Sequence, residues 1–237
     1  MKPLIKYHID YYIRSAKYLP PLLVFAIFLG INYQTAPIGV WSNLHITSVG
    51  IFIFASWIGV TFVNCEHKTQ QFLSILHTGT EDKYHLSKVA GVVVLLLPFY
   101  VITLVIPLVG GLFTRSLTLT DIVVCIIVYL LAGLMGAAVG VLFNSNIFAG
   151  EFGILAHMTA VGVSALPFNA MFEDNFIIGV LYNFVPPVNF LAQKFHALED
   201  GVFVFDLAFF GFIVWALAYA AVLILLYKNL MRRGTAV

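Results

Sequence analysis

The feature that most constrains this chain is the length of the stretches that carry no charged residue. No Asp, Glu, Lys or Arg lies between Lys17 and Glu66. Four further charge-free runs follow, at 89–114, 122–150, 152–172 and 207–227. A membrane-crossing helix needs about 20 apolar residues, so each of these four runs can cross a bilayer once and the first can cross twice. With 61% hydrophobic and 10% charged residues, the sequence predicts an all-α integral membrane protein.

We expect six transmembrane helices in a single domain, 1–237. They are predicted at about 19–33, 45–64, 89–113, 122–143, 150–169 and 204–227. Of the twelve Lys and Arg residues, all but Arg115 and Lys194 then fall on one face of the membrane. The positive-inside rule makes that crowded face cytoplasmic. The protein is therefore predicted to be a multi-pass protein of the cell (plasma) membrane with both termini in the cytoplasm.

The stretch 175–193 is also uncharged, so it could be a seventh membrane crossing. A seventh crossing there would move the C-terminal basic residues to the outside. Pro186-Pro187 lies in its middle, and proline removes a helical donor and clashes with the preceding turn. We therefore interpret the outer segment 170–203 as a re-entrant hairpin, which must face a subunit partner or the transport route to survive at membrane depth.

Residues 1–17 are predicted to form an amphipathic helix that lies in the membrane interface. The basic residues gather on about a third of the helical circumference, beside an apolar stripe that contains Ile5, Ile9 and Ile13. Such a helix lies in the interface plane and would turn into the first span near Pro20. The alternative is a frayed basic tail.

The cytoplasmic loop 65–86 is predicted to contain a second, shorter amphipathic helix. A polar stretch is followed by apolar residues at near-helical spacing, namely Phe72, Leu73, Ile75 and Leu76. Gly79 suits a helix C-cap, and Thr80 is placed to N-cap the next helix, whose first turn holds Glu81 and Asp82. The apolar face needs a cover, which lipid, the chain's own helices or a docked partner could supply.

The same loop carries a resemblance to a known family. It has the form Glu-x5-Phe-Leu-x8-Asp-Lys-Tyr-x2-Ser-Lys over Glu66–Lys88, and the outer segment is broken at Val185-Pro186-Pro187-Val188. Together with the amphipathic start and the six spans, this order of elements resembles the membrane subunit of ABC-2-type ABC transporters. The resemblance covers nearly the whole chain and points to the small six-span permeases of bacterial ABC exporters.

The resemblance implies a permease that pairs with a second permease subunit, as a homodimer or heterodimer, and with two copies of a separate ABC ATPase. It implies export of an amphipathic substrate such as a peptide, bacteriocin, antibiotic or lipid-linked molecule. No G-x-x-x-x-G-K-[ST] phosphate-binding loop occurs in the chain. ATP and Mg²⁺ would therefore be bound by the ATPase, with no cofactor bound by this chain.

The resemblance also implies an elbow helix at 1–17 and two cytoplasmic contacts with the ATPase. The first is a coupling helix, with Glu66, His67, Gln70, Gln71, Phe72, Leu73, Leu76 and His77. The second is a short loop, with Asn144, Asn146 and Glu151. For the substrate path or the dimer interface we single out Gly136, Gly140, His157, Phe184, Pro186 and Pro187.

Several of these residues have a second interpretation. Small residues at every fourth position, Ala132, Gly136 and Gly140, let helix backbones approach closely, within the chain or at a dimer seam. His157 is an ionisable group inside a span and hence a functional candidate, yet a neutral histidine can simply bond a neighbouring helix. Asp206 is expected near the outer end of the last span, where water reaches it.

Other functions are excluded by composition or left as alternatives. A net charge of +1 argues against a nucleic-acid partner. The histidines lack zinc-site spacing, and no catalytic constellation indicates an enzyme. Two alternatives to the exporter remain: an ion-coupled secondary carrier, which needs a titratable group such as His157 or Asp206, and a membrane immunity or assembly protein without a transport cycle.

Overall fold

A computed structural model describes residues 1–148, 150–166, 185–191, 194–195, 198, 201 and 203–234. These residues form eight α-helices and no strand. The helices are α1 (Lys2–Arg14), α2 (Leu19–Tyr33), α3 (Val40–Val63), α4 (Lys68–Thr78), α5 (Glu81–Val109), α6 (Leu119–Leu142), α7 (Gly150–Ala165) and α11 (Leu207–Gly234). The predicted all-α class is confirmed.

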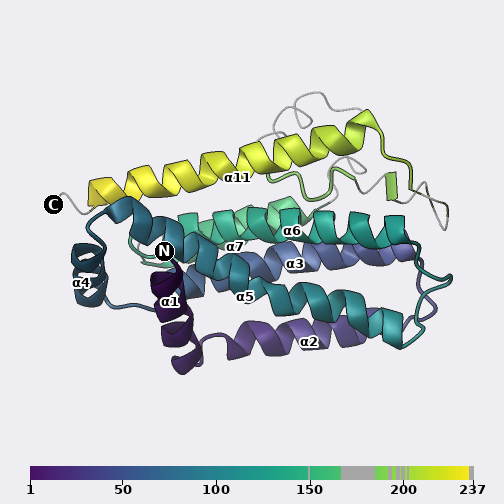
Figure 1. Cartoon of the computed structure of the whole chain (residues 1–237), viewed down its shortest axis with the longest axis horizontal. Helices are drawn as coiled ribbons and strands as arrows, with labels where there is room; N and C mark the ends of the chain where they lie inside the picture. Colours follow the sequence, from purple (N-terminus) through teal and green to yellow (C-terminus); the bar gives the residue numbers. More distant parts are fainter. Residues whose placement is uncertain are drawn as a thin grey trace.

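The long helices run side by side, up and down, so that connections gather at two ends (Figure 1). One end, which we call the α4 end, holds α1, α4 and the last turn of α11. The other, which we call the far end, holds the connections 34–39 and 110–118. Ten of the twelve Lys and Arg residues belong to segments at the α4 end, and Arg115 and Lys194 belong to the far end. The predicted charge asymmetry therefore holds in space.

Four helices, α3, α5, α6 and α11, are long and apolar enough to cross a membrane. The pair α1 and α2 meets at a bend of 79° and adds a fifth crossing if it is taken as one span. Taken alone, α2 has 15 residues and α7 has 16, and at about 1.5 Å per residue both fall short of a core about 30 Å thick. The chain is thus a membrane-embedded helical protein with four to five candidate spans.

The core lies between α3 and α6. A Cβ atom on Gly136 would stand less than 3.0 Å from the carbonyl oxygen of Phe52. A Cβ atom on Gly140 would stand equally close to the carbonyl oxygen of Ser56. Gly59 of α3 lies against Gly140 in return. The small-residue stripe therefore packs against α3 of the same chain, because only hydrogen side chains let the two backbones come this close. That face is buried and is not free for a second subunit.

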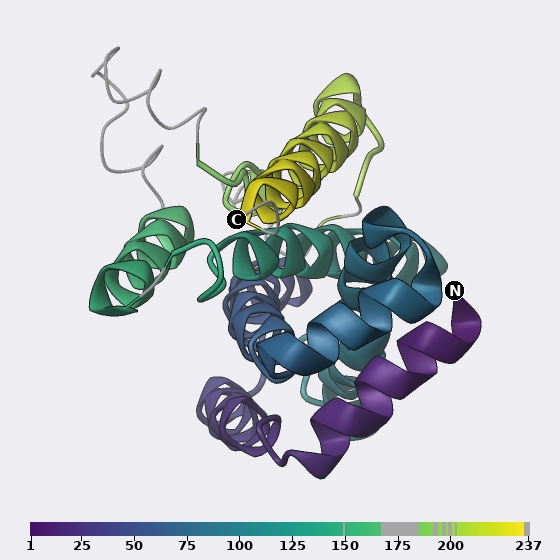
Figure 2. The same ribbon diagram turned by 90° about the vertical axis from the view of Figure 1, so that its left-hand side faces the viewer.

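The other helices stand around this central pair and expose apolar side chains. In Figure 2, α7 and α11 lie apart from each other on the outside of α6. Within α7, Gly153, Val161 and Ser164 are buried, whereas Phe152 and Met158 are well exposed. Exposed apolar side chains are expected on helices that lipid surrounds, because the bilayer core is itself apolar.

Polar contacts connect the segments at the far end. Arg115 donates to both carboxylate oxygens of Asp121, at 2.6 and 3.1 Å, and Asp121 forms a capping box with Thr118 at the start of α6. Trp41 of α3 donates its ring N–H to the Gly201 carbonyl oxygen at 2.8 Å. Arg115 also donates to that carbonyl oxygen, at 3.4 Å, so Gly201 is held against the first turn of α3 and the connection before α6.

The described part of the predicted re-entrant segment packs inside its own chain. Pro186 and Pro187 are buried, and the Asn189 side chain bonds the His45 ring at 2.9 Å. His45 is the sixth residue of α3, so the contact lies about 8 Å along that helix from its far-end start. The segment therefore enters the far end of the bundle to that depth.

Candidate functional site

A buried polar cluster lies at the α4 end, around the carboxylate of Glu66. We call it the Glu66 cluster, and its members are Tyr7, His8, Glu66, Ser74, Tyr84 and Lys88. They come from four parts of the fold: α1, the turn after α3, α4 and the first two turns of α5. Three of them belong to the Glu66–Lys88 motif, so the sequence pattern marks residues that meet in space.

The two oxygens of the Glu66 carboxylate face different helices. Oε1 accepts hydrogen bonds from Ser74 Oγ of α4 at 3.1 Å and from Tyr7 OH of α1 at 3.2 Å. Oε2 accepts from Tyr84 OH at 2.5 Å and lies 2.8 Å from Lys88 Nζ, both on α5. One side chain thus joins α1, α4 and α5.

The ion pair is buried on both sides. Glu66 is 5% exposed and Lys88 is 2% exposed, and removing two charges from water is costly unless hydrogen bonds satisfy them. Here the hydroxyl donors and the ammonium fill the acceptor positions of the carboxylate. Burial by itself would raise the pKa of Glu66, but the Lys88 charge and the donated hydrogen bonds outweigh it, so the pKa lies below its usual value.

His8 completes the cluster as a neutral ring. Its Nδ1 lies 3.7 Å from Glu66 Oε2, and the ring packs edge-on against Tyr84. Burial, reinforced by the nearby Lys88 charge, lowers the pKa of His8 to about 4, although Glu66 acts in the opposite direction. The imidazole is therefore uncharged at neutral pH, and its contact with Glu66 becomes an ion pair only in acid.

These two groups predict that acid loosens the α4 end. A histidine whose pKa falls from about 6.5 unfolded to about 4 folded binds fewer protons when folded, so its contribution is complete above pH 6.5 and is lost as the pH falls toward 4. Glu66, whose folded pKa is also lowered, acts in the same direction below about pH 4.5.

We expect the thermal unfolding midpoint in detergent to fall between pH 7 and pH 5. His8→Phe is expected to reduce that slope, because one of the groups that take up a proton in this range is gone. Circular dichroism melts of both proteins over this range check the prediction, and an equal slope in the variant would contradict it.

The α4 helix has its amphipathic faces reversed relative to an ordinary surface helix. Its polar face turns inward: Gln71 donates to the Glu66 carbonyl oxygen at 3.0 Å, and Ser74 reaches the carboxylate. Its apolar face turns outward, with Phe72, Leu73 and Leu76 exposed by 63%, 53% and 61%. A surface helix normally buries its apolar stripe, so this arrangement leaves an apolar face at the outermost part of the α4 end (Figure 1).

The helix boundaries follow the predicted signals. The His67 side chain accepts from the Thr69 N–H at the start of α4, and Gly79 ends the helix with φ +72°, a conformation that favours glycine. Thr80 precedes α5 as its N-cap residue, but its hydroxyl makes no capping bond. His67, Gln70 and His77 therefore lie on a well-bounded helix, with His67 and His77 exposed.

The predicted second contact loop lies beside the first. Asn64, two residues before Glu66, accepts from both the backbone N–H and the hydroxyl of Ser145, at 3.0 and 2.9 Å. Within that loop Asn144 is fully buried and bonds the backbone, whereas Asn146 is partly exposed. The structure thus joins the second predicted loop to Asn64, just before the first, with Asn144 in a supporting position.

The remaining predicted residues lie elsewhere. His157 of α7 bonds Ser56 of α3 at 2.7 Å, which is the helix-to-helix bond offered as its second interpretation. Glu151 is exposed in the first turn of α7. Asp206 pairs with Lys194 at 2.6 Å and accepts from the N–H of Phe209, so it caps α11 at the far end. Phe184 lies outside the described residues.

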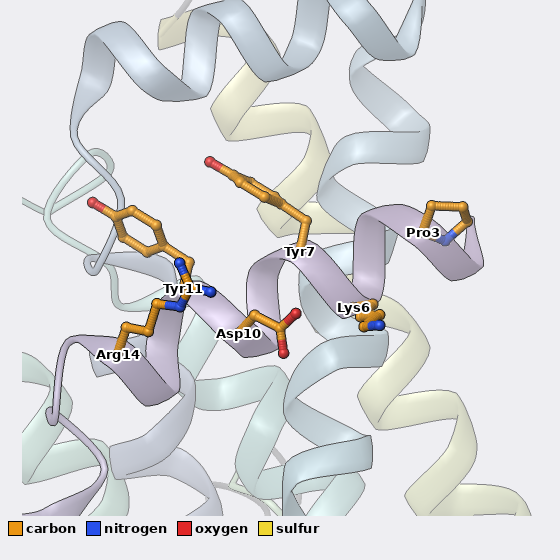
Figure 3. Close-up of a pocket in the computed structure, with 6 residues that line it drawn as sticks. All are labelled: Pro3, Lys6, Tyr7, Asp10, Tyr11 and Arg14. Atoms are coloured by element: carbon orange, nitrogen blue, oxygen red, sulfur yellow. The ribbon is translucent and has the colours of Figure 1, made fainter.

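A shallow hollow of about 360 Å³ lies on the outward face of α1. Figure 3 shows its lining residues, which are Pro3, Lys6, Tyr7, Asp10, Tyr11 and Arg14. All six come from one helix, so the hollow is an open surface rather than an enclosed site. Tyr7 connects it to the interior, because its hydroxyl bonds Glu66.

Sequence reasoning missed that Tyr84 and Lys88 belong to this site. Lys88 was counted only among the basic residues of the cytoplasmic face and in the Glu66–Lys88 motif, although an ionisable residue at the start of an apolar run is costly and normally has a buried partner. The i, i+4 spacing of Tyr84 and Lys88 places both on one face of α5. From that spacing, and from the single carboxylate Glu66 just after the preceding span, the sequence could have predicted that Tyr84 and Lys88 contact Glu66.

Comparisons with protein-family models, with curated proteins and with solved structures found no match for this chain.

Proposed function

We propose that this chain is the permease subunit of an ATP-driven exporter, and that α4 is the helix that docks onto a separate ATPase subunit. The observation that carries the proposal is the reversed α4 helix, whose polar face is occupied by Glu66 and whose apolar face points outward. The order of elements supports it, since it resembles that of ABC-2-type permeases. The exported class would be amphipathic molecules, as that resemblance implies.

In the proposed arrangement six segments cross the membrane and α1 lies in the interface. Support comes from α2 and α7, which lie alongside the longer helices (Figure 1). Support also comes from the 79° bend before α2, which sets α1 across the end of the bundle. The concentration of Lys and Arg makes the α4 end cytoplasmic under the positive-inside rule.

The proposed cover of α4 is protein rather than lipid. Seen in Figure 1, α4 lies farther out from the bundle than α1, so a membrane surface at the level of α1 leaves α4 in the aqueous phase. A helix with exposed Phe72, Leu73 and Leu76 in water matches a helix-in-groove contact, in which apolar anchors one turn apart enter a partner's groove.

We expect Leu73→Glu/Leu76→Glu to abolish association with the ATPase, because charge at the centre of an apolar contact is desolvated without a partner. The tagged chain is purified in mild detergent from its own host, and vanadate-sensitive ATP hydrolysis is measured in the eluate. Hydrolysis is expected to fall at least about tenfold, a loss of about 1.4 kcal/mol of binding.

The control is Thr69→Glu, which adds a negative charge at an exposed polar position of α4 and is expected to retain the activity. Both variants should insert and elute like the wild type, since Thr69, Leu73 and Leu76 are all exposed. Equal hydrolysis in all three preparations, or none with the wild type, would count against the docking role.

A further inference from the structure

We propose that the Glu66–Lys88 ion pair is the joint through which a displacement of α4 reaches α5. Glu66 and Lys88 would be positioning residues, acting on the spans through the helices they connect. The inference rests on the proposed function, because it supposes that a partner moves α4. It adds to that function the route by which the movement enters the bundle.

The Glu66 carboxylate links α1 and α4 to α5 through its two oxygens. Oε1 is held by α4, through Ser74, and by α1, through Tyr7, while Oε2 is held by Tyr84 and Lys88 of α5. A carboxylate is planar and rigid, so a shift of α4 that carries Oε1 along also moves Oε2 and the contacts that Tyr84 and Lys88 make with it. The charge-assisted contact with Lys88 is the strongest kind of hydrogen bond available in this cluster.

The covalent connection between α4 and α5 is a poorer route. It consists of Gly79, in the left-handed conformation at φ +72°, and Thr80, and both are exposed. The Thr80 hydroxyl makes no capping bond that would stiffen the turn. This link can absorb a change in the angle of α4, so an effective transfer of force needs the buried contact.

Movement of α5 would reach both ends of the bundle. With 29 residues and about 1.5 Å per residue, α5 runs to the far end, where the connection after it pairs with Ile38 through backbone bonds of 2.8 and 3.1 Å. At the α4 end, Asp82 of α5 forms ion pairs with Lys228 and Arg232 of α11. A tilt of α5 would therefore be shared with α11 and with the far-end connections.

The competing explanation is that the ion pair only holds the fold together. Glu66→Gln/Lys88→Met separates the two, because it removes both charges while keeping similar volumes, and replacing a buried pair as a unit is often neutral for stability. We expect this double variant to melt within about 3 °C of the wild type and to co-purify with the ATPase in wild-type amounts.

Two readouts then report the coupling itself. Permease-stimulated ATP hydrolysis is expected to fall about tenfold in the double variant, within the usual range of coupling between sites. The second readout is maleimide labelling of Val109→Cys, placed in a Cys65→Ser/Cys125→Ala background. Val109 is 80% exposed at the far-end terminus of α5. Its labelling rate is expected to change with ATP and vanadate in that background and to stay constant in the double variant.

A second variant tests the same inference if the Glu66→Gln/Lys88→Met protein is unstable. Tyr7→Phe/Ser74→Ala removes the donors to Oε1 and leaves the ion pair intact, so no buried charge loses its partner. It is expected to retain the ATPase and to lose both coupling readouts. The matched control, Tyr11→Phe/Thr69→Ala, removes hydroxyls from the same two helices away from Glu66 and is expected to behave as the wild type.

The possible results distinguish failure of this inference from failure of the proposed function. Wild-type stimulation and nucleotide-dependent labelling in both test variants would overturn the joint while leaving the docking role of α4 in place. An ATPase-free wild type would overturn the proposed function and this inference together. Retained association with lost coupling, in variants that melt normally, is the result that the inference requires.

Discussion

Glu66→Gln alone is expected to be among the most damaging single substitutions at the α4 end. It leaves the Lys88 ammonium, 2% exposed, without a counter-charge, and breaking one half of a buried ion pair costs about 3–5 kcal/mol. For a chain of this length that loss lowers the thermal unfolding midpoint by about 6–20 °C. Thermal melts of the purified proteins in the same detergent measure it.

The matched control is Glu151→Gln, the same change at an exposed carboxylate in the first turn of α7. It is expected to shift the midpoint by about 2 °C or less, because surface substitutions usually stay within about 0.5 kcal/mol. A Glu66→Gln protein as stable as this control would show that Lys88 is not held in the buried pair that the structure describes.

Gly140→Ala is the second change with a large expected effect. The added methyl group would stand within 3.0 Å of the Ser56 carbonyl oxygen and of the Gly59 backbone. Backbone atoms cannot rotate away, so α3 and α6 must separate. Overpacking of this kind costs about 1–3 kcal/mol and occasionally more. Because Ser56 also bonds His157, separation would strain the attachment of α7 as well.

The control is Gly162→Ala, where an added Cβ meets nothing within 4 Å. This identical substitution in α7 is expected to be neutral or slightly stabilising, since alanine favours a helix by about 1 kcal/mol over glycine. Midpoints of thermal unfolding, compared with the wild type, distinguish the two positions. If both substitutions had the same small effect, the close approach of α3 and α6 would be refuted.

Local features of the fold could be predicted because they depend on neighbours in sequence. The short helix over 68–78 ends at Gly79 as expected, since a left-handed residue after a helix favours glycine whatever surrounds it. The apolar runs correspond to α3, α5, α6 and α11 for the same reason: twenty apolar residues satisfy lipid without help from the rest of the chain. α5 begins at Glu81, as the predicted N-cap Thr80 indicated, so the helix extends eight residues before the predicted span.

The number of crossings could not be predicted as securely. A charge-free run shows where lipid is tolerated, but it does not say where a helix bends or stops. The run after Lys17 contains α2 and α3, and α2 alone is shorter than a bilayer core. Whether α2 and α7 complete the proposed six spans depends on the neighbours that cover their ends.

The amino-acid sequence alone determined a helical, membrane-embedded chain with its basic residues gathered at one end, because hydropathy and charge act residue by residue. Only the tertiary structure decided that Glu66 and Lys88 lie buried together, that the glycines of α6 face α3, and that α4 turns its apolar side outward. Each of these depends on which surfaces meet across the bundle. Spacing along the chain shows which residues share a helix face, but packing decides what that face touches.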